Sequence, residues 1–296
     1  MLRGLRVQRR WAALVGAVGL LIGAAGCGGS DHPQPAAQNP AQPPPAQLPA
    51  PLAVQPGPSE TLPPSVTKEE MAFLHQSFAQ ASSRQPPPNS LPPDTTITGK
   101  STGKIRTEVE KLWPEIRFIT PDGKRLKYTA VIDTELGNVE IDLLSDIAPN
   151  HVRSFVALAR AGYFDGLFFE TVIGRPHSKE PPRAVAGAAP EGDGNELGSV
   201  GYWLVPEILL PEKAAERGLR HQPGSVGTAA SPCRLYICLT EAPMWDGEYT
   251  IFGKVTRGMD VVEKMFDQLA QDDRTQPPMP PPMIRKVTIS TQPLDK

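Results

Sequence analysis

The clearest alternation of apolar and polar positions runs through residues 127–134 and 139–144. A period of two residues is typical of strands that bury one face. Between the two segments, Leu136-Gly137-Asn138 has the composition of a tight turn, because glycine and asparagine tolerate positive φ angles. The pattern therefore predicts an antiparallel hairpin. A further strand is predicted to begin at Leu167.

After the hairpin, apolar positions recur with the period of a helix. The first such stripe consists of Val152, Phe155, Val156 and Ala159. Pro149 stands near its first turn and Gly162 just beyond its last, which are preferred places for these residue types at helix ends. A second stripe, in residues 259–271, consists of Val262, Met265, Phe266 and Leu269. Both helices are expected to pack against a core.

Shorter patterns after residue 66 predict further strands and helices. Strands are predicted at residues 115–120, 125–130, 235–239 and 284–291, with Pro121-Asp122-Gly123 as the turn between the first two. A capping box at Thr67-Lys68-Glu69-Glu70 predicts a helix to about residue 83, and another helix is predicted over residues 102–112. Many short strands without a strand-helix-strand rhythm predict a mainly β domain.

Composition sets the N-terminal region apart. The chain has 35 prolines among its 296 residues, and Pro, Ala, Gln, Gly and Ser dominate residues 27–66. Such a segment has too few apolar side chains to form a core and favours an extended polyproline II chain. We therefore expect a disordered tether. Another hypothesis makes it a docking site for proline-binding modules or for this protein's own pocket.

The first 26 residues have the pattern of a bacterial export signal, with arginines before an apolar stretch at residues 11–22 and small residues before Cys27. The apolar stretch is shorter than the about 20 residues that span a bilayer. Its end resembles a lipobox, which predicts lipidation of Cys27; the alternative is an ordinary cleaved signal beside a cysteine. We expect an exported protein of the cell envelope, anchored to a membrane through Cys27 on the periplasmic or cell-surface side.

Charge and polar motifs exclude several classes of function. The formal net charge is −2, which provides no basic face for nucleic acid. No metal-ligand spacing, dinucleotide fingerprint or nucleophile elbow occurs, so neither a cofactor nor a metal is expected. Cys233 and Cys238 are expected to be unpaired and buried, because five positions along one strand separate their Cα atoms by about 16 Å. The five histidines, expected at the surface, are His32, His75, His151, His177 and His221.

Two blocks of sequence resemble the cyclophilin-type peptidyl-prolyl isomerases. The first is ELGNVEIDLLSDIAPNHVRSFVALARAGYFDGLFFETVI, and the second combines Tyr249-Thr250-Ile251-Phe252-Gly253-Lys254-Val255 with Gly258-Met259-Asp260-Val261-Val262. The resemblance covers residues 127–291. It implies a closed eight-stranded antiparallel β-barrel with a helix over each open end, and isomerisation of X-Pro bonds in protein folding. It also implies a strand at residues 201–207. Residues 67–126 would precede this domain as accessory helices, linker and hairpin.

The same resemblance implies which residues line a pocket. The family's Phe-His-Arg-Val-Ile stretch corresponds to Phe169-Glu170-Thr171-Val172-Ile173, so Thr171 stands where the family has the arginine that donates to the proline nitrogen. The other positions correspond to Arg183 and Ala184 for the cup, Ala186 and Arg234 for two glutamines, Tyr236 for the floor phenylalanine, Met244 for the rim tryptophan, with Trp245 next to it, and Tyr249 for a histidine. Only Tyr236 and Tyr249 are conservative replacements.

Catalysis is therefore expected to be weak or absent, since losing a charged donor should cost about 1.5 to 3 kcal/mol in the transition state. Arg234 or Arg183 could supply a guanidinium from another wall. Three functions stay open: an isomerase for exported proteins, a non-catalytic chaperone or peptide-binding module for proline-containing segments, and a cell-envelope scaffold that interacts through residues 67–113. The expected partners are proline-containing segments of exported proteins and the membrane.

Overall fold

The computed structural model describes residues 76–83, 86, 91–174, 182–208, 219–229, 231–270 and 280–294, which all belong to the unit Pro56–Lys296. The predicted export signal, Cys27, the tether and the capping box lie outside the described residues, as do His32, His75 and His177. Within the ranges given, no helix combines the length and the apolar character needed to cross a membrane.

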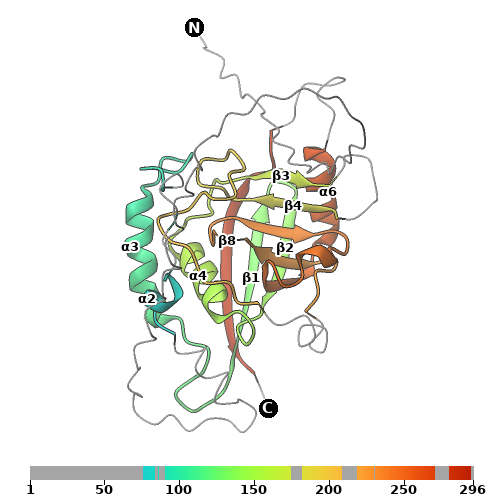
Figure 1. Cartoon of the computed structure of the whole chain (residues 1–296). Coiled ribbons are helices and arrows are strands. Elements are labelled where there is room, and N and C mark those ends of the chain that lie inside the picture. Colours follow the sequence, from blue (N-terminus) through green and yellow to red (C-terminus); the bar gives the residue numbers. More distant parts are fainter. Residues whose placement is uncertain are drawn as a thin grey trace, which may run out of the picture. The chain divides into compact units, whose positions relative to one another are not determined.

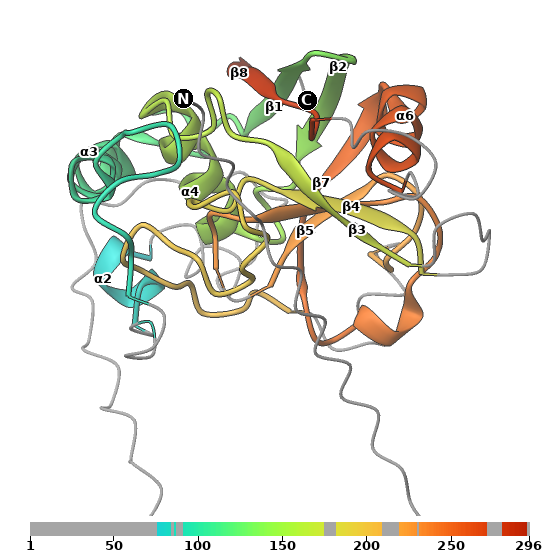
Figure 2. The same ribbon diagram turned by 90° about the horizontal axis from the view of Figure 1, so that it is seen from above.

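One antiparallel sheet of eight strands forms the body of the domain, in the order β3-β4-β6-β5-β7-β2-β1-β8. The strands are β1 (Leu126–Thr134), β2 (Gly137–Leu143), β3 (Phe169–Ile173), β4 (Ala184–Gly187), β5 (Ser225–Thr228), β6 (Leu235–Cys238), β7 (Thr250–Arg257) and β8 (Ile284–Pro293). Figures 1 and 2 show how the sheet curls on itself. The predicted mainly β fold is confirmed.

The predicted closed barrel is corrected to a curled half-barrel, because the ladder is not continuous between the edge strands β3 and β8. Their link is the single bridge between Phe168 and Met283, supported by hydrogen bonds from the Ile284 N–H to the Leu167 carbonyl and from the Gly166 N–H to the Ile284 carbonyl, both 2.7 Å. The start of β8 thus meets the residues before β3, while the rest of β8 pairs with β1. In the part of the chain that the structure describes, β3 and β8 are linked only where these two segments cross.

Local patterns predicted the hairpin of β1 and β2 well. The two strands pair from Tyr128 with Leu143 to Thr134 with Gly137, and their residues alternate between more and less buried positions. Glu135 and Leu136 form the connection, so the turn lies one residue earlier than predicted. The expected turn at residues 121–123 also forms, but its first arm is an isolated bridge between Ile119 and Arg125 rather than a strand.

Two helices lie at opposite ends of the sheet, α4 (Pro149–Arg160) and α6 (Met259–Leu269) (Figures 1 and 2). Both confirm the predicted stripes. In α4, however, every residue except Arg160 is buried. The outer side of α4 is covered by α3 (Thr102–Leu112) and by the 3-10 turn η2 (Trp113–Glu115). Within the described residues, α3 and η2 of the accessory region are therefore packed onto the half-barrel through α4.

Only a short part of the helix predicted up to residue 83 is described, as α2 (Phe78–Ala81). The Phe78 ring packs edge-on against Trp113 at 5.0 Å and Tyr202 at 5.2 Å between ring centroids. A further link comes from Arg153 of α4, which donates to the Gln76 and Ile116 carbonyls and stacks on Trp113 and Phe118. These contacts tie the segment before the sheet to α4.

The strand that the resemblance implied at residues 201–207 is wrong, because this segment belongs to no strand. Its last residue, Glu207, has another role. The carboxylate accepts hydrogen bonds from the Asn150 and His151 N–H groups at 3.0 and 2.9 Å and lies 2.6 Å from His151 Nδ1. Since α4 has no side-chain cap of its own, a distant carboxylate satisfies its N-terminal donors. His151 is therefore buried, which corrects the prediction of a surface histidine.

Removing the Glu207 carboxylate is expected to destabilise the domain strongly. A Glu207→Ala change leaves two buried N–H groups and His151 without their acceptor, and breaking a buried polar pair from one side costs about 3 to 5 kcal/mol. Glu207→Gln keeps one acceptor oxygen and should lose less. Urea unfolding of the three proteins measures both effects; equal stability of wild type and the alanine variant would contradict this role of Glu207.

Candidate functional site

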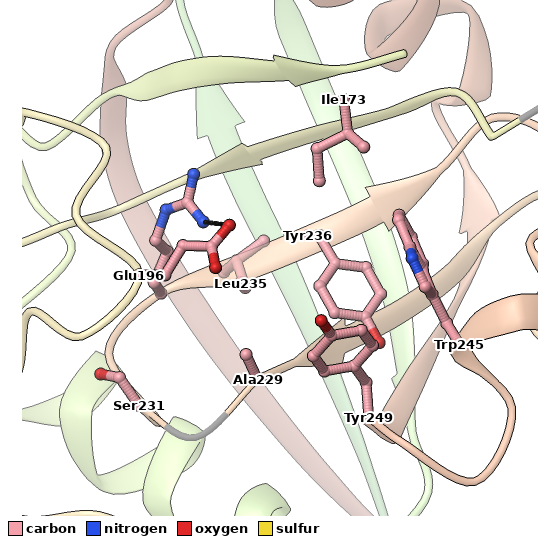
Figure 3. A pocket seen from close by; sticks show the side chains of 9 residues that line it. Ile173, Glu196, Ala229, Ser231, Leu235, Tyr236, Trp245 and Tyr249 are labelled. Atoms are coloured by element: carbon pink, nitrogen blue, oxygen red, sulfur yellow. Dashed lines mark ion pairs between the residues drawn. The ribbon is translucent and has the colours of Figure 1, made fainter. Parts of the chain in front are cut away.

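A cavity of about 190 Å³ lies beside β6 (Figure 3). Its lining comes from the end of β3, the loop after β4, the connection between β5 and β6, β6 itself and the 3-10 turn η3 (Pro243–Trp245). The lining residues are Ile173, Glu196, Ala229, Ser231, Arg234, Leu235, Tyr236, Trp245 and Tyr249. Segments far apart in the sequence thus meet at one hollow.

One end of the cavity is aromatic. The Tyr236 ring lies 5.1 Å from the Trp245 ring and 6.1 Å from the Tyr249 ring, and the last two lie 5.9 Å apart, all with edge-on geometry. Ile173 and the buried Ala186 pack against the same cluster. Figure 3 shows the three rings on the side of the cavity away from Glu196. Such a cup suits a small apolar ring, since aromatic faces give large contact area at low entropic cost.

The opposite end of the cavity is charged. Arg234 Nε lies 3.4 Å from the Glu170 carboxylate, and Arg234 Nη1 lies 3.7 Å from that of Glu196. The two acids differ in exposure, since the Glu170 side chain is 6% exposed and that of Glu196 is 68% exposed. Glu170 also accepts hydrogen bonds from the N–H groups of Ala188, at 3.1 Å, and Ala189, at 3.4 Å. The guanidinium is therefore held by one buried carboxylate and met from solvent by another.

Burial has a large effect on Glu170. It raises the pKa of this carboxyl group to about 7, although Arg234 and the two backbone N–H groups partly offset that rise. A group with this pKa changes its charge close to neutral pH. The compensation of the Arg234 charge therefore depends on pH within the physiological range.

A chain of hydrogen bonds fixes the floor of the cavity from behind. His221 Nδ1 lies 2.7 Å from Asp246 Oδ1, which also accepts from the His221 backbone N–H at 2.8 Å, and His221 Nε2 lies 2.8 Å from the Tyr236 hydroxyl. Because Nδ1 donates to the carboxylate, Nε2 accepts and the hydroxyl donates to it. Gly227 makes room, since a Cβ there would lie 2.3 Å from the hydroxyl oxygen. Tyr236 forms the floor of the cavity, and Asp246 directly follows Trp245 at its rim. His221 therefore connects the floor to the rim through its two hydrogen bonds.

His221 is buried, which corrects the second prediction of a surface histidine. Burial lowers the pKa of His221, and the neighbouring Asp246 opposes that shift. Burial also raises the pKa of the Tyr236 hydroxyl well above its ordinary value. Both groups are therefore neutral at pH 7, and the ring of Tyr236 offers an uncharged floor.

Several predicted site residues meet at the cavity, namely Arg234, Tyr236, Trp245 and Tyr249 on its wall, with Ala186 and Glu170 directly behind. Others lie elsewhere. Phe169 is part of the main core. Met244 is 56% exposed and does not line the cavity, whereas the adjacent Trp245 does. Thr171 pairs with Ala186 in the ladder and lies close to Gly194, outside the lining.

Arg183 lies away from the cavity, against α6. Its Nη2 is 3.2 Å from a Glu263 carboxylate oxygen, and its guanidinium lies 4.3 Å from the centre of the Phe266 ring. Sequence reasoning assigned no role in the lining to Ile173, Glu196, Ala229, Ser231 and Leu235. Ile173 ends the motif that contains Thr171 and could have been included on that ground, whereas no local pattern marks the others.

Chemically, the arrangement joins an apolar cup to a donor of fixed position. Among the described residues, no group of three or more His, Cys, Asp or Glu side chains is placed to hold a metal ion. Cys233 and Cys238 are free and buried, as predicted, and burial raises the pKa of both thiols to about 12. The cavity is therefore suited to holding a ring and a polar backbone segment.

Sequence comparisons relate the chain to known proteins. The family model for cyclophilin type peptidyl-prolyl cis-trans isomerase/CLD matches residues 129–289. A peptidyl-prolyl cis-trans isomerase of Helicobacter pylori is 31% identical over 143 residues, 46% of this chain and 78% of that protein. The peptidyl-prolyl isomerase CWC27 of Cryptococcus neoformans is 29% identical over 168 residues, 56% of this chain but only 32% of that protein, so the match spans about a third of its length.

A solved structure of a Cryptosporidium parvum cyclophilin type peptidyl-prolyl cis-trans isomerase is also similar. It has 21% sequence identity and a TM-score of 0.45, and the match covers 56% of this chain and 99% of that chain.

Acid is expected to destabilise the domain through His221. Because burial lowers its pKa below the ordinary value of 6.5, the unfolded chain takes up this proton at a higher pH than the folded chain. The stabilisation from the neutral ring is thus complete above about pH 6.5 and is lost as the pH falls further. Between about pH 7.5 and 5.5, the free energy of unfolding measured in urea should fall more for wild type than for His221→Gln. Equal losses in both proteins would rule out this contribution.

Proposed function

The chain belongs to the cyclophilin-type peptidyl-prolyl isomerase family, and we propose that its cavity binds X-Pro segments of polypeptide chains. The observation that carries the proposal is the cup of Tyr236, Trp245 and Tyr249 in a hollow of about 190 Å³. A proline ring is apolar and compact, so it fits an aromatic cup beside a polar wall.

We propose that catalysis is slow compared with relatives that carry the arginine at the Thr171 position. The cis and trans forms of an X-Pro bond differ by only about 0.5 to 1 kcal/mol, while the barrier between them is about 18 to 20 kcal/mol. A catalyst has to favour the twisted amide through a cup, contacts to the flanking backbone and a donor to the nitrogen. Thr171 lies outside the lining, and its hydroxyl carries no charge.

Two features of the sequence extend this proposal to the whole protein. The export-signal pattern with Cys27 and the proline-rich segment after it support an exported, membrane-anchored protein whose substrates are other exported proteins. A tether of this composition would hold the domain at a distance from the membrane surface.

A non-catalytic binding module or chaperone is the second candidate. Thr171 at the arginine position favours it, because a cup without that donor can still bind proline. The scaffold hypothesis has less support from α3, because its apolar residues Ile105 and Val109 are buried and α3 therefore packs its apolar side onto its own domain.

The aromatic cup makes a direct prediction for binding. Trp245→Ala should weaken the affinity for an Ala-Pro peptide by about tenfold or more, because it removes one of the three rings. Met244→Ala is the matched control, since Met244 is the adjacent residue, lies outside the lining and is 56% exposed. Titrations followed by amide chemical shifts measure both dissociation constants. Equal affinities in the two variants would refute the proposed binding site.

A further inference from the structure

We propose that Arg234, the residue directly before β6, is the catalytic donor of this pocket, in place of a cation on β3. This inference rests on the proposed binding of X-Pro segments. It concerns a position where the family resemblance implied a glutamine, and its support is the local geometry of three neighbouring strands.

The first support is the ladder register. Thr171 of β3 pairs with Ala186 of β4, and Ala186 pairs with Tyr236 of β6, so these residues form one row across the sheet. Directly paired residues point to the same face, and so do residues two apart along a strand. Arg234, the residue directly before β6, lines the same cavity as Tyr236. Thr171 and Ala186 are short, which leaves space on that face for a long side chain that enters from the residue before β6.

The second support is a bulge in β3. The register shifts between Phe169, which pairs with Gly187, and Thr171, which pairs with Ala186, so Glu170 is the extra residue. Bulges redirect side chains and are frequent beside active sites. Here the redirected carboxylate lies 3.4 Å from Arg234 Nε. The bulge that shifts the register of β3 thus also places the Glu170 carboxylate as the counter-charge of Arg234.

The third support is the way in which the guanidinium is held. Glu170 anchors Nε from a buried position, and Glu196 meets Nη1 at 3.7 Å from an exposed one. Within the part of the chain that the structure describes, Nη2 has no acidic partner. Arg234 itself is 9% exposed and lines the cavity. An arginine fixed at one edge by a buried carboxylate is a preorganised donor, because little reorganisation is needed when it is used.

The chemistry needs no transfer of atoms. As the X-Pro amide twists, conjugation is lost and the lone pair localises on the proline nitrogen. A guanidinium N–H can donate a hydrogen bond to that lone pair only in the twisted form, which lowers the barrier without strengthening ground-state binding. The bond is released when planarity returns. Arg183 is not placed for this role, because Glu263 and Phe266 hold its guanidinium on α6.

The variant Arg234→Gln tests the assignment. Its isomerisation rate constant at saturating Ala-Pro peptide, measured by exchange NMR without a helper protease, is expected to fall about tenfold or more, which corresponds to at least about 1.4 kcal/mol. Its dissociation constant should change less than about threefold, because the donor acts in the transition state. Arg257→Gln is the matched control, since Arg257 carries the same charge on β7 and its side chain is 79% exposed.

Folding of Arg234→Gln is checked by its amide spectrum and urea midpoint. If the variant misfolds, Arg234→Lys takes its place. It retains a cation but lacks the planar guanidinium, so its rate constant should fall, and an unchanged rate constant would count against the assignment. Where Arg234→Gln folds, the double variant Thr171→Arg/Arg234→Gln should regain at least part of the lost rate, because it restores a guanidinium on β3. Failure of the folded double variant to exceed Arg234→Gln counts against the assignment.

The outcomes separate the inference from the proposed function. If wild type binds and isomerises the peptide but Arg234→Gln keeps its rate, Arg234 is not the donor and the binding proposal stands. If wild type binds without isomerising, the inference is overturned in favour of a binding module. If wild type does not bind the peptide, the proposed function itself fails.

Glu170 gives the assignment a pH signature. Its pKa of about 7 means that its carboxylate compensates the Arg234 charge above neutral pH and loses that charge below it. The groups that face it are Arg234 and, on the buried side, Tyr163, whose pKa burial raises. A neutral carboxyl group keeps an acceptor oxygen for Arg234 Nε but no longer offsets the guanidinium charge, so it holds the side chain and leaves it a stronger donor. The rate should therefore rise several-fold between about pH 8 and pH 6 in wild type and stay flat in Glu170→Gln. Parallel pH profiles in both proteins would contradict the coupling.

Discussion

The pocket depends on the hydrogen bonds and the ion pair that compensate the charge of one buried carboxylate, Glu170. Glu170 is enclosed by the protein, and an unpaired carboxylate in such a place would cost several kcal/mol. Its partners come from two directions, the N–H groups of Ala188 and Ala189 just after β4 and the guanidinium of Arg234 just before β6. These contacts connect β3 to the segments that flank β4 and β6, the next two strands of the sheet. They also place one positive charge on the wall of the hollow, next to the exposed carboxylate of Glu196.

The other end of the pocket is organised by a second polar chain. Asp246, His221 and Tyr236 connect the rim to the floor, and each proton in that chain has one acceptor. The rings it positions provide apolar contact, whereas Arg234 provides the only charge-bearing donor among the described lining residues. Binding and barrier lowering thus belong to separate side chains. Because the two roles are separate, the aromatic cup can bind proline whether the donor stands at position 171 or, as proposed, at Arg234.

Much of the fold was predictable because its signals are local. The hairpin of β1 and β2, the helices α4 and α6 and the strand β8 follow from periodicity, and the resemblance supplied their order. The gap between β3 and β8 was not predictable, because it depends on where two distant segments cross. His151 and His221 were misplaced at the surface for a similar reason, since their acids, Glu207 and Asp246, lie 56 and 25 residues away in the chain.

For the site, correspondence with the family named Arg234, Tyr236, Trp245 and Tyr249, but it could not show the bulge that aims Glu170 at Arg234. The central claim is that this guanidinium faces the bound proline. A crystal structure of the chain with an Ala-Pro peptide tests it most directly. The account predicts the proline ring on Tyr236 and a guanidinium nitrogen of Arg234 within about 3.5 Å of the proline nitrogen. A peptide bound elsewhere, or seated in the cup with Arg234 turned away from it, would contradict the account.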